Sequence, residues 1–329
     1  MTAHPECVLN RWIAAMAGIA LSAAGCSRGD TPSRAAADAP PAPTRISIPG
    51  ERVFPESITS TADGTLYIGS VGQAQIYRVP PGADSAEVFI PPGTADIKQV
   101  FGVLADETSG TLWACSNLLA DGPPGAGPPG PSALHGFELA TGVSSSSHAL
   151  PAGAMCNDIA VAPGGDTFVT DTNGMRVLRL AQGTTALEAW SPAGAFGPPG
   201  GVLDGISVVG GRVIVNTLAT SRLFAVEIAG DGKAGVVKEL TLSAPLSAPD
   251  GMRAHGADGV LVTDGSGKIQ HVTISGDAAT VTTVKDGLDG PVSVTAVGRT
   301  GYALEGQLGI LFGSGQAEKP YRAVVFTLP

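Results

Sequence analysis

The feature that most constrains the fold is a short pattern that recurs six times along the chain. Each copy has a strand that starts at a polar or small residue, a glycine-containing turn and a second apolar strand. The aligned strand positions lie 46, 55, 47, 46 and 42 residues apart: Glu56, Gly102, Asn157, Asp204, Asp250 and Val292. Several short strands per unit and a period of about 40–50 residues are typical of a β-propeller. The sequence therefore predicts an all-β fold, a six-bladed β-propeller over residues 45–329.

Composition and the two ends of this region agree with that prediction. Glycine occurs 46 times and proline 26 times, aromatic residues make up 5% of the chain, and no stretch has a sustained helical period. The last repeat lacks an outer strand. We expect residues 45–48 to supply it beside residues 323–328, so that an N-terminal strand closes the ring and covers its edges. The Gly/Pro-rich run at 119–131 explains the longest interval and is expected to be a loop in the second blade.

Four repeats carry an oxygen-bearing side chain at the same position, namely Glu56, Asn157, Asp204 and Asp250. Inner strands of a propeller line its central channel, so these side chains are predicted to converge there. Three carboxylates close together repel one another unless a cation lies between them. Oxygen ligands suit a hard ion. We therefore predict a central metal channel that holds one divalent metal, Ca²⁺ first, with Mg²⁺ or Mn²⁺ as alternatives.

The first 44 residues are expected to lie outside the fold. Trp12 to Ala24 has the length and apolar character of a signal-peptide core, which predicts a signal peptide at residues 1–25. Ala23-Ala24-Gly25-Cys26 resembles a bacterial lipoprotein cleavage site, with Cys26 as the lipidated residue; an ordinary secretory signal is the alternative. Residues 26–44 are predicted to be a disordered tether. The expected location is the periplasmic side of a bacterial membrane, held only through the lipid anchor.

Two cysteines remain in the predicted propeller, Cys115 and Cys156. In an oxidising compartment they could form a disulfide, and two buried free thiols are the alternative. The net charge of −10 argues against nucleic acid as a partner. We expect a monomer.

The short motifs resemble the senescence marker protein/gluconolactonase/luciferin-regenerating enzyme family. The likeness covers about residues 45–329 and lies in Pro55-Glu56, Asn157-Asp158-Ile159-Ala160-Val161 and Pro249-Asp250-Gly251-Met252. The resemblance implies a six-bladed propeller with one metal in its channel. Characterised members of this family mostly hydrolyse lactones or related esters. By the same resemblance, Glu56 and Asp250 are metal ligands, Asp204 stands where a ligand Asn is common, and Asn157 contacts substrate or metal. Met155 stands where sugar-lactone hydrolases have Arg, which puts sugar-lactone specificity in doubt.

The sequence thus favours a metal-dependent hydrolase of a small-molecule lactone or ester, with Asp204 or Asp250 as the general base. The alternative is a non-catalytic binding or scaffold propeller whose channel ion is structural, because propellers host many functions. A free coordination position open to solvent would favour the enzyme, and a saturated ion would favour the scaffold.

Overall fold

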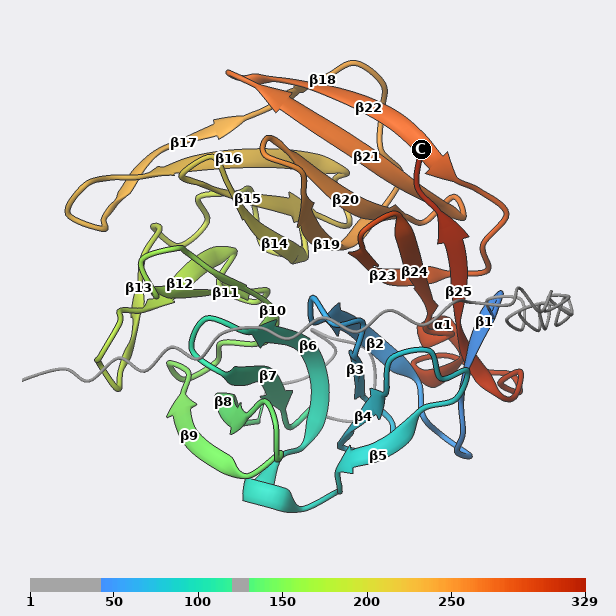
Figure 1. Cartoon of the computed structure of the whole chain (residues 1–329). Helices are drawn as coiled ribbons and strands as arrows, with labels where there is room; N and C mark the ends of the chain where they lie inside the picture. Colours follow the sequence, from blue (N-terminus) through green and yellow to red (C-terminus); the bar gives the residue numbers. More distant parts are fainter. Residues whose placement is uncertain (1–42, 120–129) are drawn as a thin grey trace, which may run out of the picture. The chain divides into compact units, whose positions relative to one another are not determined.

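The computed structural model describes residues 43–119 and 130–329. Its strands form six sheets, five of four strands and one of five (Figure 1). The regular elements that are not strands are a four-residue helix α1 (Leu308–Leu311) and a 3₁₀ turn (Thr94–Asp96). The predicted all-β, six-bladed propeller is confirmed. The leader, Cys26 and the tether up to residue 42 lie outside the described residues.

The first strand of each sheet is its innermost, and these six strands neighbour one another in a closed order. Each contacts the inner strands of the sheets before and after it, and the sixth contacts the first. They are β2 (Pro55–Ser60), β6 (Gln99–Asp106), β10 (Cys156–Val161), β14 (Leu203–Val209), β19 (Pro249–His255) and β23 (Pro291–Val297). The site is built on these strands.

The second and third strands of each sheet extend away from the inner strand by antiparallel pairing. The second strands are β3 (Leu66–Ser70), β7 (Thr111–Asn117), β11 (Thr167–Asp171), β15 (Arg212–Thr217), β20 (Gly259–Asp264) and β24 (Thr300–Glu305). The third strands are β4 (Gln75–Val79), β8 (Ser132–Glu138), β12 (Arg176–Leu180), β16 (Arg222–Ile228), β21 (Lys268–Ser275) and β25 (Tyr321–Thr327).

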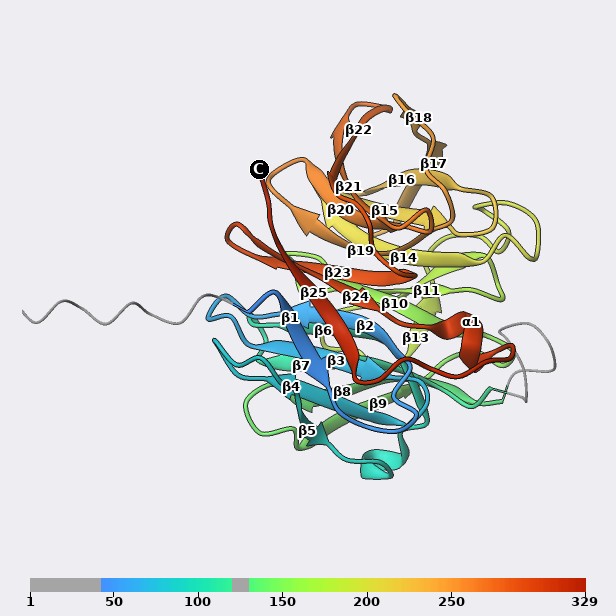
Figure 2. The same cartoon turned by 90° about the vertical axis from the view of Figure 1, so that its right-hand side faces the viewer.

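The outer strands are the most exposed. They are β5 (Glu87–Ile90), β9 (Ser144–Ala149), β13 (Leu187–Ala189), β17 (Ala234–Glu239), β22 (Ala278–Lys285) and β1 (Arg45–Ile48), with β18 (Thr241–Leu242) as a parallel fifth strand beside β22. β1 pairs antiparallel with β25, from Arg45 opposite Val324 to Ile48 opposite Tyr321, and both views draw the two strands side by side (Figures 1 and 2). The two ends of the described chain thus share one sheet.

The hydrophobic core consists of six clusters, one at each junction between successive sheets. The alternation of side chains along a strand produces this arrangement. In β15, Val213 and Val215 pack toward the third sheet, whereas Ile214 between them packs toward the fifth. A strand inside a blade such as β15 therefore buries both faces, which explains why such strands read as short apolar runs instead of alternating patterns.

The Asp-Gly turn of the first repeat shows how local sequence sets a hairpin. Gly64 has φ +95°, a conformation that side chains disfavour. The Asp63 carboxylate accepts hydrogen bonds from the Thr61 hydroxyl at 2.6 Å and the Thr65 amide at 2.9 Å. Among the described residues, no helix has the length and apolarity needed to cross a membrane.

Candidate metal centre and cavity

A β-bulge interrupts the pairing of every inner strand near its first residue. The pairing skips between Pro55 and Ser57 in β2, and at the corresponding points of the other five inner strands. The residues that follow the last regular pair are Glu56, Phe101, Asn157, Asp204, Asp250 and Val292. All six line one cavity. A bulge re-aims a side chain, and here the same bulge in all six strands directs one side chain per blade into the same space.

The structure corrects the predicted alignment in the second repeat. Val100 pairs with Ser116 as Cys156 pairs with Asp171, so Phe101 occupies the position that the sequence alignment gave to Gly102. Gly102 is the second bulge residue, equivalent to Gly205 and Gly251. A side chain at Gly205 would place its Cβ 2.5 Å from the Asp250 carbonyl oxygen, so glycine permits neighbouring inner strands to approach. The second blade therefore contributes an aromatic ring to the cavity.

The four oxygen-bearing residues predicted to converge do so at one end of the inner strands. Carboxylate oxygens of Glu56, Asp204 and Asp250 all lie within 4.8 Å of one another. Glu56 is 6% exposed and Asp204 5%, while Asp250 is partly buried. Ca²⁺–oxygen bonds of about 2.3–2.6 Å would allow one ion to contact oxygens at this separation. The donor set consists of oxygen atoms, which suits a hard divalent cation.

Asn157 completes the cluster with an unsatisfied acceptor. Its Nδ2 donates to Asp204 Oδ2 and to Thr172 Oγ1, both at 3.1 Å. Its Oδ1 is buried and has no hydrogen-bond partner. A buried acceptor without a partner costs free energy comparable to a lost hydrogen bond. An orphaned amide oxygen among buried carboxylates fits a site that accepts a cation.

The raised pKa values of the three carboxyl groups also fit a site that accepts a cation. Burial raises the pKa of Asp204 to about 7; a hydrogen bond with Asp250 opposes that shift, and the charge of Asp158 adds to it. The pKa of Asp250 is well above its ordinary value because of burial and the neighbouring Asp204 and Glu56. Burial, followed by the charges of Asp204 and Asp158, likewise raises the pKa of Glu56, and Arg253 partly offsets this. Without a cation, these carboxyl groups retain protons that a metal would displace.

A second buried polar group lies further along the same inner strands. Arg253 of β19, 8% exposed, reaches across to β10, where its Nη1 lies 3.0 and 2.9 Å from the two Asp158 carboxylate oxygens. Its Nη2 donates to Ser57 Oγ of β2 at 3.0 Å and to the Val103 carbonyl of β6 at 2.9 Å. One guanidinium thus ties four of the six inner strands together. The sequence analysis did not identify it.

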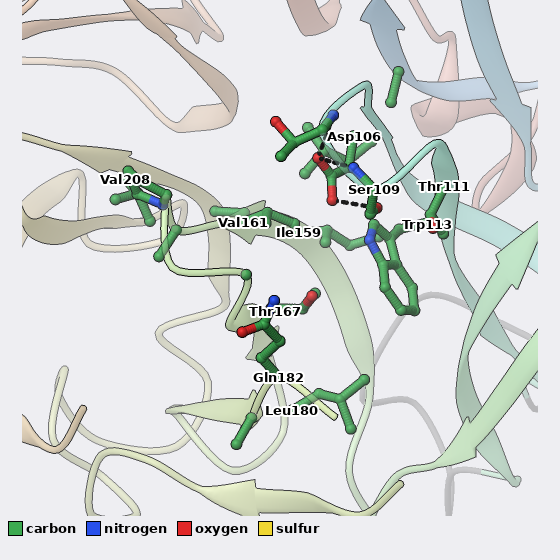
Figure 3. Close-up of a pocket in the computed structure, with 18 of the residues that line it drawn as sticks. Asp106, Ser109, Thr111, Trp113, Ile159, Val161, Thr167, Leu180, Gln182 and Val208 are labelled. Carbon is green, nitrogen blue, oxygen red and sulfur yellow. Dashed lines mark hydrogen bonds between the residues drawn. The ribbon is translucent and has the colours of Figure 1, made fainter. Parts of the chain in front are cut away.

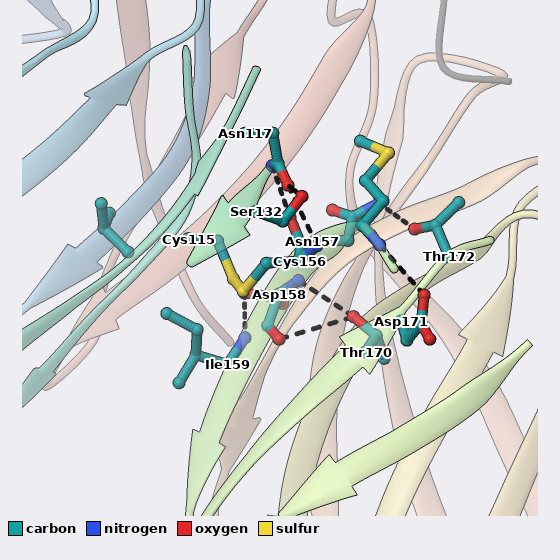
Figure 4. Close-up of a disulfide and its surroundings, with 12 residues drawn as sticks. Cys115, Asn117, Ser132, Cys156, Asn157, Asp158, Ile159, Thr170, Asp171 and Thr172 are labelled. Carbon is teal, nitrogen blue, oxygen red and sulfur yellow. Dashed lines mark hydrogen bonds between the residues drawn. A yellow bond between two sulfur atoms is a disulfide. The ribbon is translucent and has the colours of Figure 1, made fainter. Parts of the chain in front are cut away.

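A disulfide between Cys115 and Cys156 holds the strand that carries Asn157 (Figure 4). The two Cα atoms are 5.2 Å apart, and the bond joins β7 of the second blade to β10 of the third. Asn117 adds two hydrogen bonds at the same junction, accepting from the Cys156 amide at 3.1 Å and donating to its carbonyl at 2.7 Å. The residue before Asn157 is therefore fixed by one covalent and two polar links.

The cavity above the carboxylates has a volume of about 660 Å³, within the usual range for small-molecule sites. Its walls come from the inner strands, from neighbouring loops and from the segment after β24. That segment includes α1 and packs against two separate cores: Ile310 and Leu311 contact the core between the sixth and first blades, and Leu311 and Phe312 contact the core between the second and third. It therefore lines the cavity while it spans the ends of the first and second blades.

A larger cavity of about 960 Å³ is lined by Val161 and Val208, among others (Figure 3), which stand near the ends of β10 and β14 opposite to Asn157 and Asp204. Arg253 lines it, together with Ile159 and Ile206, while none of the four oxygen-bearing residues does. At its rim Asp106 is already bonded by its own turn, through the Ser109 amide and hydroxyl at 3.4 and 2.5 Å. The Arg253–Asp158 pair therefore lies between two cavities.

Other residues weighed from the sequence have different places. Glu305 is bonded to the Arg322 Nε at 2.5 Å and to the Asp289 amide at 2.8 Å, so its carboxylate is engaged within the sixth blade. Met155 is buried in the core between the second and third blades and does not line the cavity. Of the histidines in the described residues, none lines the cavity above the carboxylates.

No family model and no curated protein matches the chain. Several solved structures match the chain. A gluconolactonase from Xanthomonas campestris, described as important in glucose secondary metabolic pathways, matches with 15% identity, a TM-score of 0.60 and coverage of 85% of this chain and 87% of the other. A luciferin-regenerating enzyme matches with 12% identity, a TM-score of 0.57 and coverage of 84% and 90%.

A third structural neighbour carries a different activity. Virginiamycin B lyase from Staphylococcus aureus matches with 13% identity, a TM-score of 0.56 and coverage of 87% of this chain and 98% of the other. At these identities the similarity establishes the fold and not the reaction. The chain is a six-bladed β-propeller whose structural neighbours include gluconolactonases and a luciferin-regenerating enzyme.

Proposed function

We propose that this protein is a metal-dependent hydrolase of lactones or small esters. The observation that supports the proposal most strongly is the buried cluster of three carboxylates and an orphaned amide oxygen at the floor of a ligand-sized cavity. A cation held there would be approachable from the cavity side, because the partly buried Asp250 and its neighbours line that space. An ion open on one side favours an enzyme over a structural ion in a scaffold propeller.

Glu56, Asn157, Asp204 and Asp250 would hold the cation, with Ca²⁺ favoured and Mg²⁺ or Mn²⁺ as alternatives. When bound, the cation would supply Lewis-acid polarisation of a carbonyl oxygen. Asp204 or Asp250 is proposed as the general base for an attacking water. A carboxylate whose pKa lies above its ordinary value is a better proton acceptor near neutral pH, which suits this role.

The lyase among the structural neighbours raises a second reaction class. One of the virginiamycin lyase structures is a catalytically inactive histidine-to-alanine variant with quinupristin bound, which shows that a histidine matters in that protein. In the part of this chain that the structure describes, no histidine lines the cavity. Among the described residues, the cavity above the carboxylates thus offers no histidine as a base for such a lyase reaction, whereas it offers two carboxylates as a base for hydrolysis.

The test is a hydrolysis screen over lactones and aryl esters with the chelator-treated protein, and with the same protein after addition of Ca²⁺, Mg²⁺ or Mn²⁺. We expect activity that chelator removes and one of the cations restores. Calorimetric titration of each cation into the stripped protein measures binding separately. Cation binding without hydrolysis of any substrate would favour the scaffold, and absence of cation binding would contradict the proposed site.

A further inference from the structure

The walls of the cavity above the carboxylates are mostly apolar. Side chains from three blades and from the segment after β24 surround it, namely Phe101, Leu218, Val292, Leu308, Ile310 and Phe312. They form a collar above the polar floor of Glu56, Asn157, Asp204 and Asp250. A ligand that reaches the floor must therefore place the rest of its surface against carbon.

The few polar groups in these walls are already engaged. The Thr172 hydroxyl donates to the Leu203 carbonyl at 2.7 Å and accepts from Asn157. The Gln307 amide donates to the Glu318 carbonyl at 2.9 Å and accepts from the Glu318 amide at 2.7 Å, which holds the segment around α1 in place. Thr172 and Gln307 thus have little capacity left for a ligand.

Charge excludes further ligand classes. Of the residues the structure describes, no lysine, arginine or histidine lines this cavity, and the charged group at its rim is the exposed carboxylate of Asp289. A phosphorylated or carboxylated substrate would find no counter-charge beyond a cation at the floor. A sugar lactone would leave its hydroxyl groups desolvated against carbon, at a cost for each one that finds no partner.

We infer that the substrate is a neutral lactone or ester with an apolar alkyl or aryl substituent, whose carbonyl group points to the carboxylate floor and whose substituent lies in the collar. This inference rests on the proposed function, because it assigns a substrate class to that site. Each methylene group buried in the collar is expected to raise kcat/KM about fourfold until the substituent outgrows the cavity.

The experiment compares three lactones that share a δ-lactone ring, using the cation-loaded full chain: δ-valerolactone without a substituent, δ-dodecanolactone with an alkyl chain, and glucono-δ-lactone with hydroxyl groups. We expect kcat/KM for δ-dodecanolactone to exceed that for δ-valerolactone by at least about a hundredfold. Glucono-δ-lactone should be the poorest of the three. Phe312→Ala and Leu218→Asn should each reduce the alkyl preference about tenfold or more, whereas the exposed Val236→Ala should leave it unchanged.

Binding provides a readout that does not depend on catalysis. Metal-free protein should bind δ-dodecanolactone in a calorimetric titration with a negative heat-capacity change, and Phe312→Ala should weaken that binding. Equal or better hydrolysis of glucono-δ-lactone would overturn the inference and leave the proposed function intact. Apolar binding without hydrolysis of any lactone or ester would support the collar and contradict the proposed function. Absence of alkyl-lactone binding would overturn the inference directly.

Discussion

Two polar clusters are buried on the six inner strands, and they differ in how their charges are balanced. Around Arg253, the guanidinium and the Asp158 carboxylate neutralise each other within 3.0 Å, and Ser57 and a backbone carbonyl take further donors. Around Asp204, three carboxyl groups face one another and the Asn157 oxygen has no partner. The charge of the first cluster is balanced within the chain, and Arg253 Nε is its one nitrogen without a partner, whereas the charge of the second cluster can be balanced only by a cation or by protons.

The difference separates structural from functional burial. A buried ion pair whose opposite charges are in direct contact can tie strands together at modest net cost. A buried cluster of like charges is unfavourable by itself, and its pKa values rise so that protons replace the missing positive charge. The bulge of β10 contributes to both clusters, because its two residues point in different directions: Asn157 belongs to the carboxylate cluster and Asp158 pairs with Arg253. β10 therefore supplies both a proposed metal ligand and the carboxylate that pairs with Arg253.

The largest expected effect comes from removing one carboxylate of the proposed metal site. Asp250→Ala should abolish detectable cation binding and lower hydrolysis at least about a hundredfold, because the remaining ligands cannot offset dehydration of the ion. Calorimetric titration and initial rates measure these effects. The exposed Asp277→Ala, which removes a surface partner of Lys238, serves as the control and should alter neither. Undiminished cation binding by Asp250→Ala would show that the cluster is not the metal site.

Removing one partner of the Arg253–Asp158 pair should lower the stability of the folded protein. Asp158→Asn leaves the Arg253 charge buried without a counter-charge, and we expect a loss of about 3–5 kcal/mol in the free energy of unfolding. Urea denaturation measures it. The exposed pair of Arg222 and Glu239 provides the matched control, since Glu239→Gln should cost less than about 1 kcal/mol. Similar values for the two variants would refute the structural role assigned to Arg253.

The double variant sharpens this prediction. Replacing Arg253 by Met together with Asp158 by Leu removes both charges, so the double variant should be more stable than Asp158→Asn. It should also keep cation binding, since neither residue is a proposed ligand. Loss of cation binding in a folded double variant would show that the two clusters are not separable.

Stability of the metal-free protein should depend on pH with a defined sign. Asp204 has a pKa of about 7 in the folded protein against an ordinary 3.8. Between these values the folded state binds more protons than the unfolded state, so the free energy of unfolding falls as pH rises through this window. Thermal denaturation at several pH values measures the trend, and saturating Ca²⁺ should remove the loss near neutral pH. Stability that rises through the window without metal would contradict the raised pKa.

The smallest effect is expected from Asp204→Asn. The amide keeps an oxygen for the cation and removes one negative charge, so we expect cation affinity to fall only about tenfold, or 1.4 kcal/mol. The pH dependence of the metal-free protein should become shallower in the same variant, because Asp204 no longer titrates. Complete loss of cation binding would show that the negative charge of Asp204, and not its oxygen, is what the site requires.

The six repeats and the convergence of Glu56, Asn157, Asp204 and Asp250 could be predicted from the amino-acid sequence alone, because a repeat puts equivalent side chains at the same place in each blade. The sequence could not place Phe101, because β6 has four regular pairs between its bulge and its turn where β10 has three, and that number depends on how the strands pair. Arg253 and Asp158 are 95 residues apart and meet only across the ring. The apolar collar was equally hidden, because loops far apart in the chain form it. Local periodicity is written in the chain, whereas contacts between distant segments arise only when the blades pack together.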